Sequence, residues 1–161
     1  MAQLRLIALA LCAACGTSEA APPPSSGLTA PAGWQVAPQI AKAASEAAGS
    51  SATSSEAWAE PARGCYAVWI GLHGAAGAID AAADRLVASV QKLGVTTSEV
   101  AKPAAGEHGE LQLAFAKQPY RGKLRAQLAK TGDVIALACM WNEREPKACE
   151  TSCATLLGSL R

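Results

Sequence analysis

The last third of the chain alternates apolar segments with turn residues, and this pattern restricts the fold more than any other feature of the sequence. Apolar residues at every second position in 110–116 and 123–129 predict two strands, each with one buried face. The segment 133–141, apolar after its first residue, predicts a third strand that is buried on both faces. The sequence therefore predicts an antiparallel meander over about residues 110–141.

Two helices are expected to pack against this meander. Residues 77–93 carry apolar side chains at helical spacing, and a second helix is expected to begin at Pro146 and to continue to residue 160. Because the strand 133–141 is apolar on both faces, we expect helices on both faces of the sheet. The expected fold class is α+β, an α/β sandwich: a mostly antiparallel sheet packed by helices at about 77–93 and 146–160.

The first half of the domain gives weaker patterns. Residues 34–36 suggest a short strand, and the alanine-rich segment 38–48 suggests a helix with proline at its start. Residues 49–55 have the composition of a loop. The β-branched and aromatic segment 64–72 predicts a strand, and 95–100 suggests another.

The N-terminus has the pattern of an export signal. In residues 1–14 one cation, Arg5, precedes an apolar run that is too short to cross a bilayer and that ends in small residues. The end of this segment, Leu11-Cys-Ala-Ala-Cys15, resembles the lipobox of bacterial lipoproteins. The resemblance implies that Cys15 becomes the N-terminus and carries a diacylglyceryl group and an acyl chain such as palmitate. The alternative is an ordinary secretory signal; both interpretations export the protein.

The predicted location is the cell envelope. Residue 16 is glycine and not an acidic retention residue, so the lipobox resemblance implies the outer membrane, facing the periplasm, in a Gram-negative host. Residues 15–27 are rich in proline and serine and are expected to be a flexible tether. Residues 28–161 are expected to form a single domain.

The charge of the mature chain excludes an obvious electrostatic partner. Loss of Arg5 leaves thirteen basic residues of fourteen, which balance the thirteen acidic residues. The sequence has no basic patch of the kind that binds nucleic acid. We therefore expect a partner in the envelope and no nucleic acid.

Four cysteines remain after export and lipidation: Cys65, Cys139, Cys149 and Cys153. An even number of cysteines in an exported chain predicts disulfides, and three pairings are open. We favour Cys139–Cys149 with Cys65–Cys153, because the connection from Cys139 to the last helix is short. Buried free thiols and a thiolate site for copper or zinc are the alternatives, but the spacing does not match a zinc ribbon. No metal or cofactor site is predicted.

Other chemistry-bearing residues are expected to be structural. His73 and His108, the two histidines, are interpreted as loop side chains, and the glycines of 71–77 as turn formers. The carboxylate pairs Asp80 with Asp84 and Glu143 with Glu145 are expected on solvated surfaces. The tryptophans are expected mainly in the core; the candidates for a ligand or partner surface are Trp58, Trp69 and Trp141.

The order of elements resembles the PsbP-like superfamily, which includes the LpqN-type bacterial lipoproteins. The matching segments are Ala30-Pro-Ala-Gly-Trp34, the meander 110–141 and Leu156-Leu-Gly-Ser-Leu-Arg161. The resemblance implies a generally non-enzymatic α/β sandwich that serves as a binding or assembly module.

The sequence thus predicts an exported, lipid-anchored module that binds a protein or another component of the envelope and is not an enzyme. A carrier of a small ligand or a metal, based on the cysteines, is the first alternative. A hydrolase whose site is assembled only in space is the second.

Overall fold

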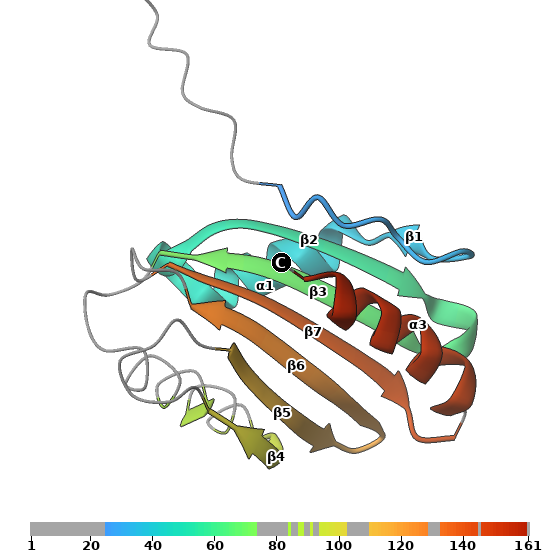
Figure 1. Cartoon of the computed structure of the whole chain (residues 1–161). Helices are drawn as coiled ribbons and strands as arrows, with labels where there is room; N and C mark the ends of the chain where they lie inside the picture. Colours follow the sequence, from blue (N-terminus) through green and yellow to red (C-terminus); the bar gives the residue numbers. More distant parts are fainter. Residues whose placement is uncertain are drawn as a thin grey trace, which may run out of the picture.

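A computed structural model of the chain describes residues 25–73, 84, 87–88, 91, 94–102, 110–128, 133–144 and 146–160. The elements are β1 (Gln35–Val36), α1 (Pro38–Ala48), β2 (Ala52–Glu60), β3 (Cys65–Leu72), β4 (Thr96–Ala101), β5 (Glu110–Lys117), β6 (Tyr120–Leu128), β7 (Val134–Asn142) and α3 (Pro146–Ser159). The strands form one antiparallel sheet in the order β1-β2-β3-β7-β6-β5-β4 (Figure 1). The predicted helix at 77–93 lies largely outside the described residues.

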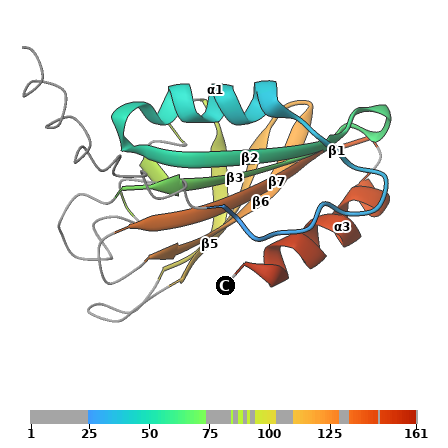
Figure 2. The same ribbon diagram turned by 90° about the horizontal axis from the view of Figure 1, so that it is seen from above.

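The helices α1 and α3 lie on opposite faces of the sheet (Figure 2). Helix α1 packs its Ile40 and Ala41 against small and β-branched residues of β2 and β3. Helix α3 follows β7 directly and returns along β3 and β7 on the other face (Figure 1). The central strands β3 and β7 are therefore covered on the α3 face, as their apolar sequences require.

The largest core lies between α3 and the sheet. Its apolar helix residues are Cys149, Cys153, Leu156 and Leu160, which recur at helical spacing as the sequence predicts. The strands and the segment before β1 contribute the other buried residues of this core: Trp34, Trp58, Cys65, Ala67, Trp69, Leu137, Cys139 and Trp141. All of these residues are at least nine-tenths buried.

The predicted helix-packed α/β sandwich is wrong, because the chain forms a sheet-dominated fold. The sheet is broader than its α3 covering: β4, β5 and β6 extend beyond α3 on the same face (Figure 1). There, Gln112 of β5 and Arg121 and Lys123 of β6 are exposed to solvent. Antiparallel sheets tolerate such a solvated region because polar side chains can alternate with buried ones.

The prediction of a loop at 49–55 also fails, because β2 begins at Ala52. Alanine and serine give no strand signal of their own, so tertiary contacts decide the conformation. Strand β2 pairs with β3 along nearly its whole length, and its Ala57 and Ala59 pack beneath α1. The Ser55 hydroxyl donates to the Ala41 carbonyl oxygen of α1 at 2.8 Å. The small side chains of β2 thus allow α1 to pack closely against the strand.

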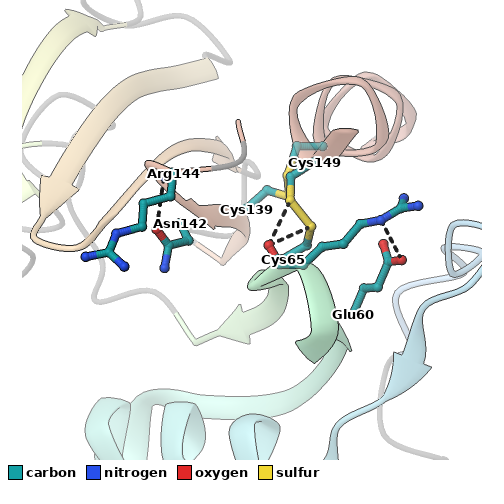
Figure 3. Close-up of a disulfide and its surroundings, with 8 residues drawn as sticks. Glu60, Cys65, Cys139, Asn142, Arg144 and Cys149 are labelled. Carbon is teal, nitrogen blue, oxygen red and sulfur yellow. Dashed lines mark hydrogen bonds and ion pairs between the residues drawn. A yellow bond between two sulfur atoms is a disulfide. The ribbon is translucent and has the colours of Figure 1, made fainter. Parts of the chain in front are cut away.

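Two disulfides join α3 to the central strands: Cys65–Cys149, which Figure 3 shows, and Cys139–Cys153, each with a Cα–Cα distance of 5.6 Å. The presence of disulfides was predicted correctly, but the favoured pairing was wrong. Because Cys65 pairs with Trp141 in the sheet, it lies near the end of β7, where α3 begins.

The helix register explains the observed pairing. From Cys149 to Cys153 the helix rises about 6 Å, at about 1.5 Å per residue. Going back two residues along β7, from Trp141 to Cys139, covers about 7 Å. The first helix cysteine therefore meets Cys65, and the second meets Cys139.

Candidate functional site

The three tryptophans that the sequence offers as a partner surface do not form one. Trp58, Trp69 and Trp141 are 4%, 2% and 3% exposed and belong to the core beneath α3. The prediction of a tryptophan surface is therefore wrong. A large aromatic side chain gains most from burial, and this core takes its bulk from tryptophan rather than from phenylalanine. Trp69 nevertheless contributes an edge of its ring to a cavity described below.

The cysteines predicted from the sequence as disulfide candidates are also unavailable as metal ligands. Cys65, Cys139, Cys149 and Cys153 are closed in the two disulfides and are at most 1% exposed. A cysteine binds a metal through its thiolate, and a sulfur atom in a disulfide is not a thiolate. Across the described ranges, no group of three or more histidine, cysteine, aspartate or glutamate residues could hold a metal ion.

The structure describes one member of each predicted carboxylate pair, Asp84 and Glu143. Asp84 contacts Lys102, and Glu143 accepts a hydrogen bond from Arg121 at 3.1 Å. Their predicted partners, Asp80 and Glu145, lie outside the described residues, as does His108. Each described carboxylate therefore has a cationic partner on the surface, as expected for a solvated face.

His73 does not stand alone in its loop. It follows β3 directly, and Asp133 directly precedes β7. Because Leu72 pairs with Val134 in the antiparallel ladder, the next residues of both strands meet. His73 Nδ1 lies 2.8 Å from Asp133 Oδ1, and the His73 main-chain N–H donates to the Ser51 carbonyl oxygen at 2.7 Å. The imidazole is thus oriented by a carboxylate and by its own backbone.

These two residues form the rim of a cavity of about 220 Å³, which we call the Gly71 cavity. Its described lining residues are Ser25, Thr53, Trp69, Gly71, Leu72, His73, Asp133, Val134 and Ile135. The cavity lies on the α3 face of the sheet, because Trp69 and Gly71 share that face with Cys65.

A β-bulge in β2 places two hydroxyl groups beside Gly71. The register with β3 shifts between Ala52 and Ser54, which leaves Thr53 as the extra residue. A Cβ atom placed on Gly71 would lie 2.7 Å from Thr53 Oγ1 and 3.4 Å from Ser54 Oγ. A glycine at position 71 therefore leaves room for the Thr53 hydroxyl, which occupies the place that a methyl group would need.

The Gly71 cavity could bind a ligand or accept a proton. An imidazole held at Nδ1 by a carboxylate presents Nε2 outward as a base or a donor. The sequence does not reveal this arrangement, because β3 and β7 are separated by 61 residues, between Leu72 and Val134. The missed signal is a pair of apolar strands of 8 and 9 residues, with a polar residue, His73 or Asp133, next to the paired ends.

A second polar cluster, on β6, is structural. Arg125 Nη1 donates to the Leu157 carbonyl oxygen at 2.6 Å, and Gln127 donates to the Leu160 carbonyl oxygen at 3.1 Å. Both acceptors lie at the C-terminal end of α3, where carbonyl groups lack partners within the helix. Arg125 Nη2 also donates to Glu110 Oε2 at 2.7 Å. The hydrogen bond from Arg125 holds the pKa of the Glu110 carboxyl below its usual range.

This lowered pKa predicts a loss of stability in acid. The unfolded chain binds a proton at Glu110 near its ordinary pKa of about 4.3, above the folded value, so acid favours unfolding. The contribution of Glu110 to the free energy of unfolding is present above that pH and disappears as the pH falls through the pKa of Glu110 in the folded chain. We expect Glu110→Gln to flatten the fall of the unfolding free energy in this range, measured by urea unfolding at several pH values. An unchanged slope would contradict the assignment; Glu150→Gln on the exposed side of α3 is the control.

The first described residues are attached to the sheet. The Ser26 main-chain N–H donates to Glu56 Oε1 at 2.9 Å, and its hydroxyl also contacts Glu56. Leu28 packs against the core, and residues 26–31 with Thr155, Leu156 and Ser159 of α3 line an open cavity of about 630 Å³. Among its described lining residues this larger cavity has no charged group, so the Gly71 cavity is the better candidate site.

The sequence matches no family model, and no curated protein is significantly similar to it. None of the helices within the described residues is both long and apolar enough to cross a membrane.

Proposed function

We propose that this protein is an exported, lipid-anchored and non-catalytic binding module of the bacterial cell envelope. Its two disulfides are the observation that supports export best. Disulfides persist in oxidising compartments outside the cytoplasm, and all four cysteines of the domain are paired here. The signal-like segment 1–14 points to the same compartment.

The proposed anchor lies close to the folded domain. The contacts of Ser26 with Glu56 begin eleven positions after Cys15, the residue that would carry the lipid. Ten residues, 16–25, reach at most about 35 Å when fully extended. In the proposed arrangement the end of the sheet beside Ser25 therefore stays near the bilayer, in the periplasm of a Gram-negative host. Because Ser25 also lines the Gly71 cavity, that cavity would lie beside the tether.

The anchor is testable by mass spectrometry of the full chain expressed in a Gram-negative host. We expect the N-terminal peptide from the membrane fraction to begin at Cys15 and to carry a diacylglyceryl group and an acyl chain. Cys15→Ser should remove the lipid and release most of the protein into the soluble periplasmic fraction, since a domain without acyl chains has no stable anchor.

Cys12→Ser is the matched control, because it alters the other cysteine of the same segment. It should leave the lipid and the membrane fraction unchanged. A wild-type peptide without lipid, or a Cys15→Ser variant that keeps its lipid, would show the anchor proposal to be wrong.

The alternatives have less support. A carrier based on thiolates would need reduced cysteines, whereas each cysteine of the domain is paired. A hydrolase could use His73 with Asp133, but within the described residues no serine or threonine hydroxyl is hydrogen-bonded to the imidazole. The resemblance to the PsbP-like superfamily stays a prediction and is not needed for this proposal.

A further inference from the structure

The two hydroxyls of the bulge differ in their access to the Gly71 cavity. Ser54 Oγ is shielded from solvent and has no hydrogen-bond partner within the described residues, and Ser54 does not line the cavity. Thr53 is exposed and does line it. A molecule in the cavity can therefore bond to the Thr53 hydroxyl, which both donates and accepts hydrogen bonds.

The polar groups of the cavity suit a ligand that both donates and accepts hydrogen bonds. At its rim the His73 imidazole and the Asp133 carboxylate face each other, with Nδ1 and Oδ1 2.8 Å apart. The other polar side chains of the lining, Ser25 and Thr53, are hydroxyls, which both donate and accept hydrogen bonds. A neutral ligand whose own groups both donate and accept is the best complement. Hydroxyl groups on a compact carbon frame have this property.

The other walls of the cavity are apolar. Ile135 of β7 and the ring edge of Trp69 supply apolar side chains on this face, whereas the side chains of Leu72 and Val134 pack into the core on the other face. Such walls suit the C–H groups of a ring, and an indole edge beside polar groups is common where a ligand is partly apolar. A volume of about 220 Å³ equals about seven waters at about 30 Å³ each, which suits a single sugar-sized ring.

We propose that the Gly71 cavity binds a neutral polyhydroxylated ring, such as one sugar unit of an envelope glycan or glycolipid. Thr53 would bond to one of its hydroxyl groups, and His73 would bond to it from the rim. This inference deepens the proposed function and rests on the domain being a binding module. It does not rest on the lipid, so the two can fail separately.

The test is a titration of the oxidised, ¹⁵N-labelled full chain in detergent with N-acetylglucosamine, followed by amide chemical shifts. We expect saturable shifts centred on Gly71, Thr53 and His73 at millimolar concentrations. Sodium acetate and sodium phosphate are the ionic comparisons. If an anion gives the saturable shifts and the sugar does not, or if neither moves these amides, the proposal is wrong.

Two variants locate the binding. Gly71→Ala places a methyl group in the cavity, 2.7 Å from the present position of Thr53 Oγ1, and should abolish the saturable shifts. Thr53→Val removes one hydroxyl from an exposed residue while leaving the cavity open, and should weaken binding about tenfold, since a hydrogen bond contributes about 1–1.5 kcal/mol. Gly158→Ala in α3 is the control and should bind like the wild type. Unchanged binding in both cavity variants would overturn the assignment.

Vesicles that contain a monoglycosyl diacylglycerol separate the two sources of such a ring. If these vesicles broaden the cavity amides at sugar concentrations where free N-acetylglucosamine does not shift them, the ligand is a lipid headgroup. If the free sugar suffices, a glycan is favoured. Lipid on Cys15 with no response to either probe would leave the anchor standing and refute the sugar site.

Discussion

Removal of Cys65–Cys149 by the double substitution Cys65→Ala/Cys149→Ala is expected to lower the unfolding free energy by about 4.5 kcal/mol. The pair Cys139→Ala/Cys153→Ala is expected to lower it by about 3 kcal/mol. The difference follows from the loops that the disulfides close, which have sequence separations of 84 and 14. In the chain-entropy model a longer loop restricts the unfolded chain more. Urea unfolding of each oxidised variant, followed by tryptophan fluorescence, gives both values.

Loss of both disulfides should leave the chain largely unfolded, because the summed loss approaches the 5–15 kcal/mol stability of an ordinary domain. The crossed pair Cys65→Ala/Cys153→Ala is a sharp control for the connectivity. It leaves one partner of each disulfide, so two free thiols should be titratable with a thiol reagent. Each double variant that removes both cysteines of one disulfide should leave no free thiol among the four cysteines of the domain. A crossed variant without free thiols would show that the connectivity is different.

The elements that the sequence predicts correctly are those whose pattern is contained in one continuous segment. The strand 64–72, the helix 38–48 and the meander 110–141 follow from apolar periodicity, proline positions and turn residues. The stripe of α3 was also predicted, including Cys149 and Cys153 on its buried side. The presence of disulfides follows from an even cysteine count in an exported chain.

Features that depend on distant pairing could not be predicted in this way. Strand β2 is built from alanine and serine and exists because β3 and α1 provide its partners. The disulfide pairing depends on the opposition of Cys65 to Trp141, which no spacing reveals. The Gly71 cavity combines a bulge in β2 with the facing ends of β3 and β7, so its residues come from three separate segments.

Gly122 of β6 tests how tightly the centre of the sheet is packed. It pairs with Phe115 on one side and with Met140 on the other. A Cβ atom at this position would overlap the Cys139 carbonyl oxygen and the Phe115 ring. The carbonyl belongs to the main chain of β7, and a disulfide joins Cys139 to Cys153 of α3. This carbonyl group therefore cannot move aside easily. The Phe115 ring therefore occupies the space that any other residue 122 would need.

We expect Gly122→Ala to lower the unfolding free energy by about 3 kcal/mol, at the upper end of overpacking costs. Gly158→Ala makes the same chemical change in α3, where no atom lies within 4 Å of the new methyl group. It should raise stability by about 0.5 kcal/mol, because alanine favours a helix over glycine. Urea unfolding of both oxidised variants gives the comparison. Shifts of the same sign and similar size would mean that the space above Gly122 is not filled as described, whereas opposite signs follow directly from the packing of Phe115 against β6.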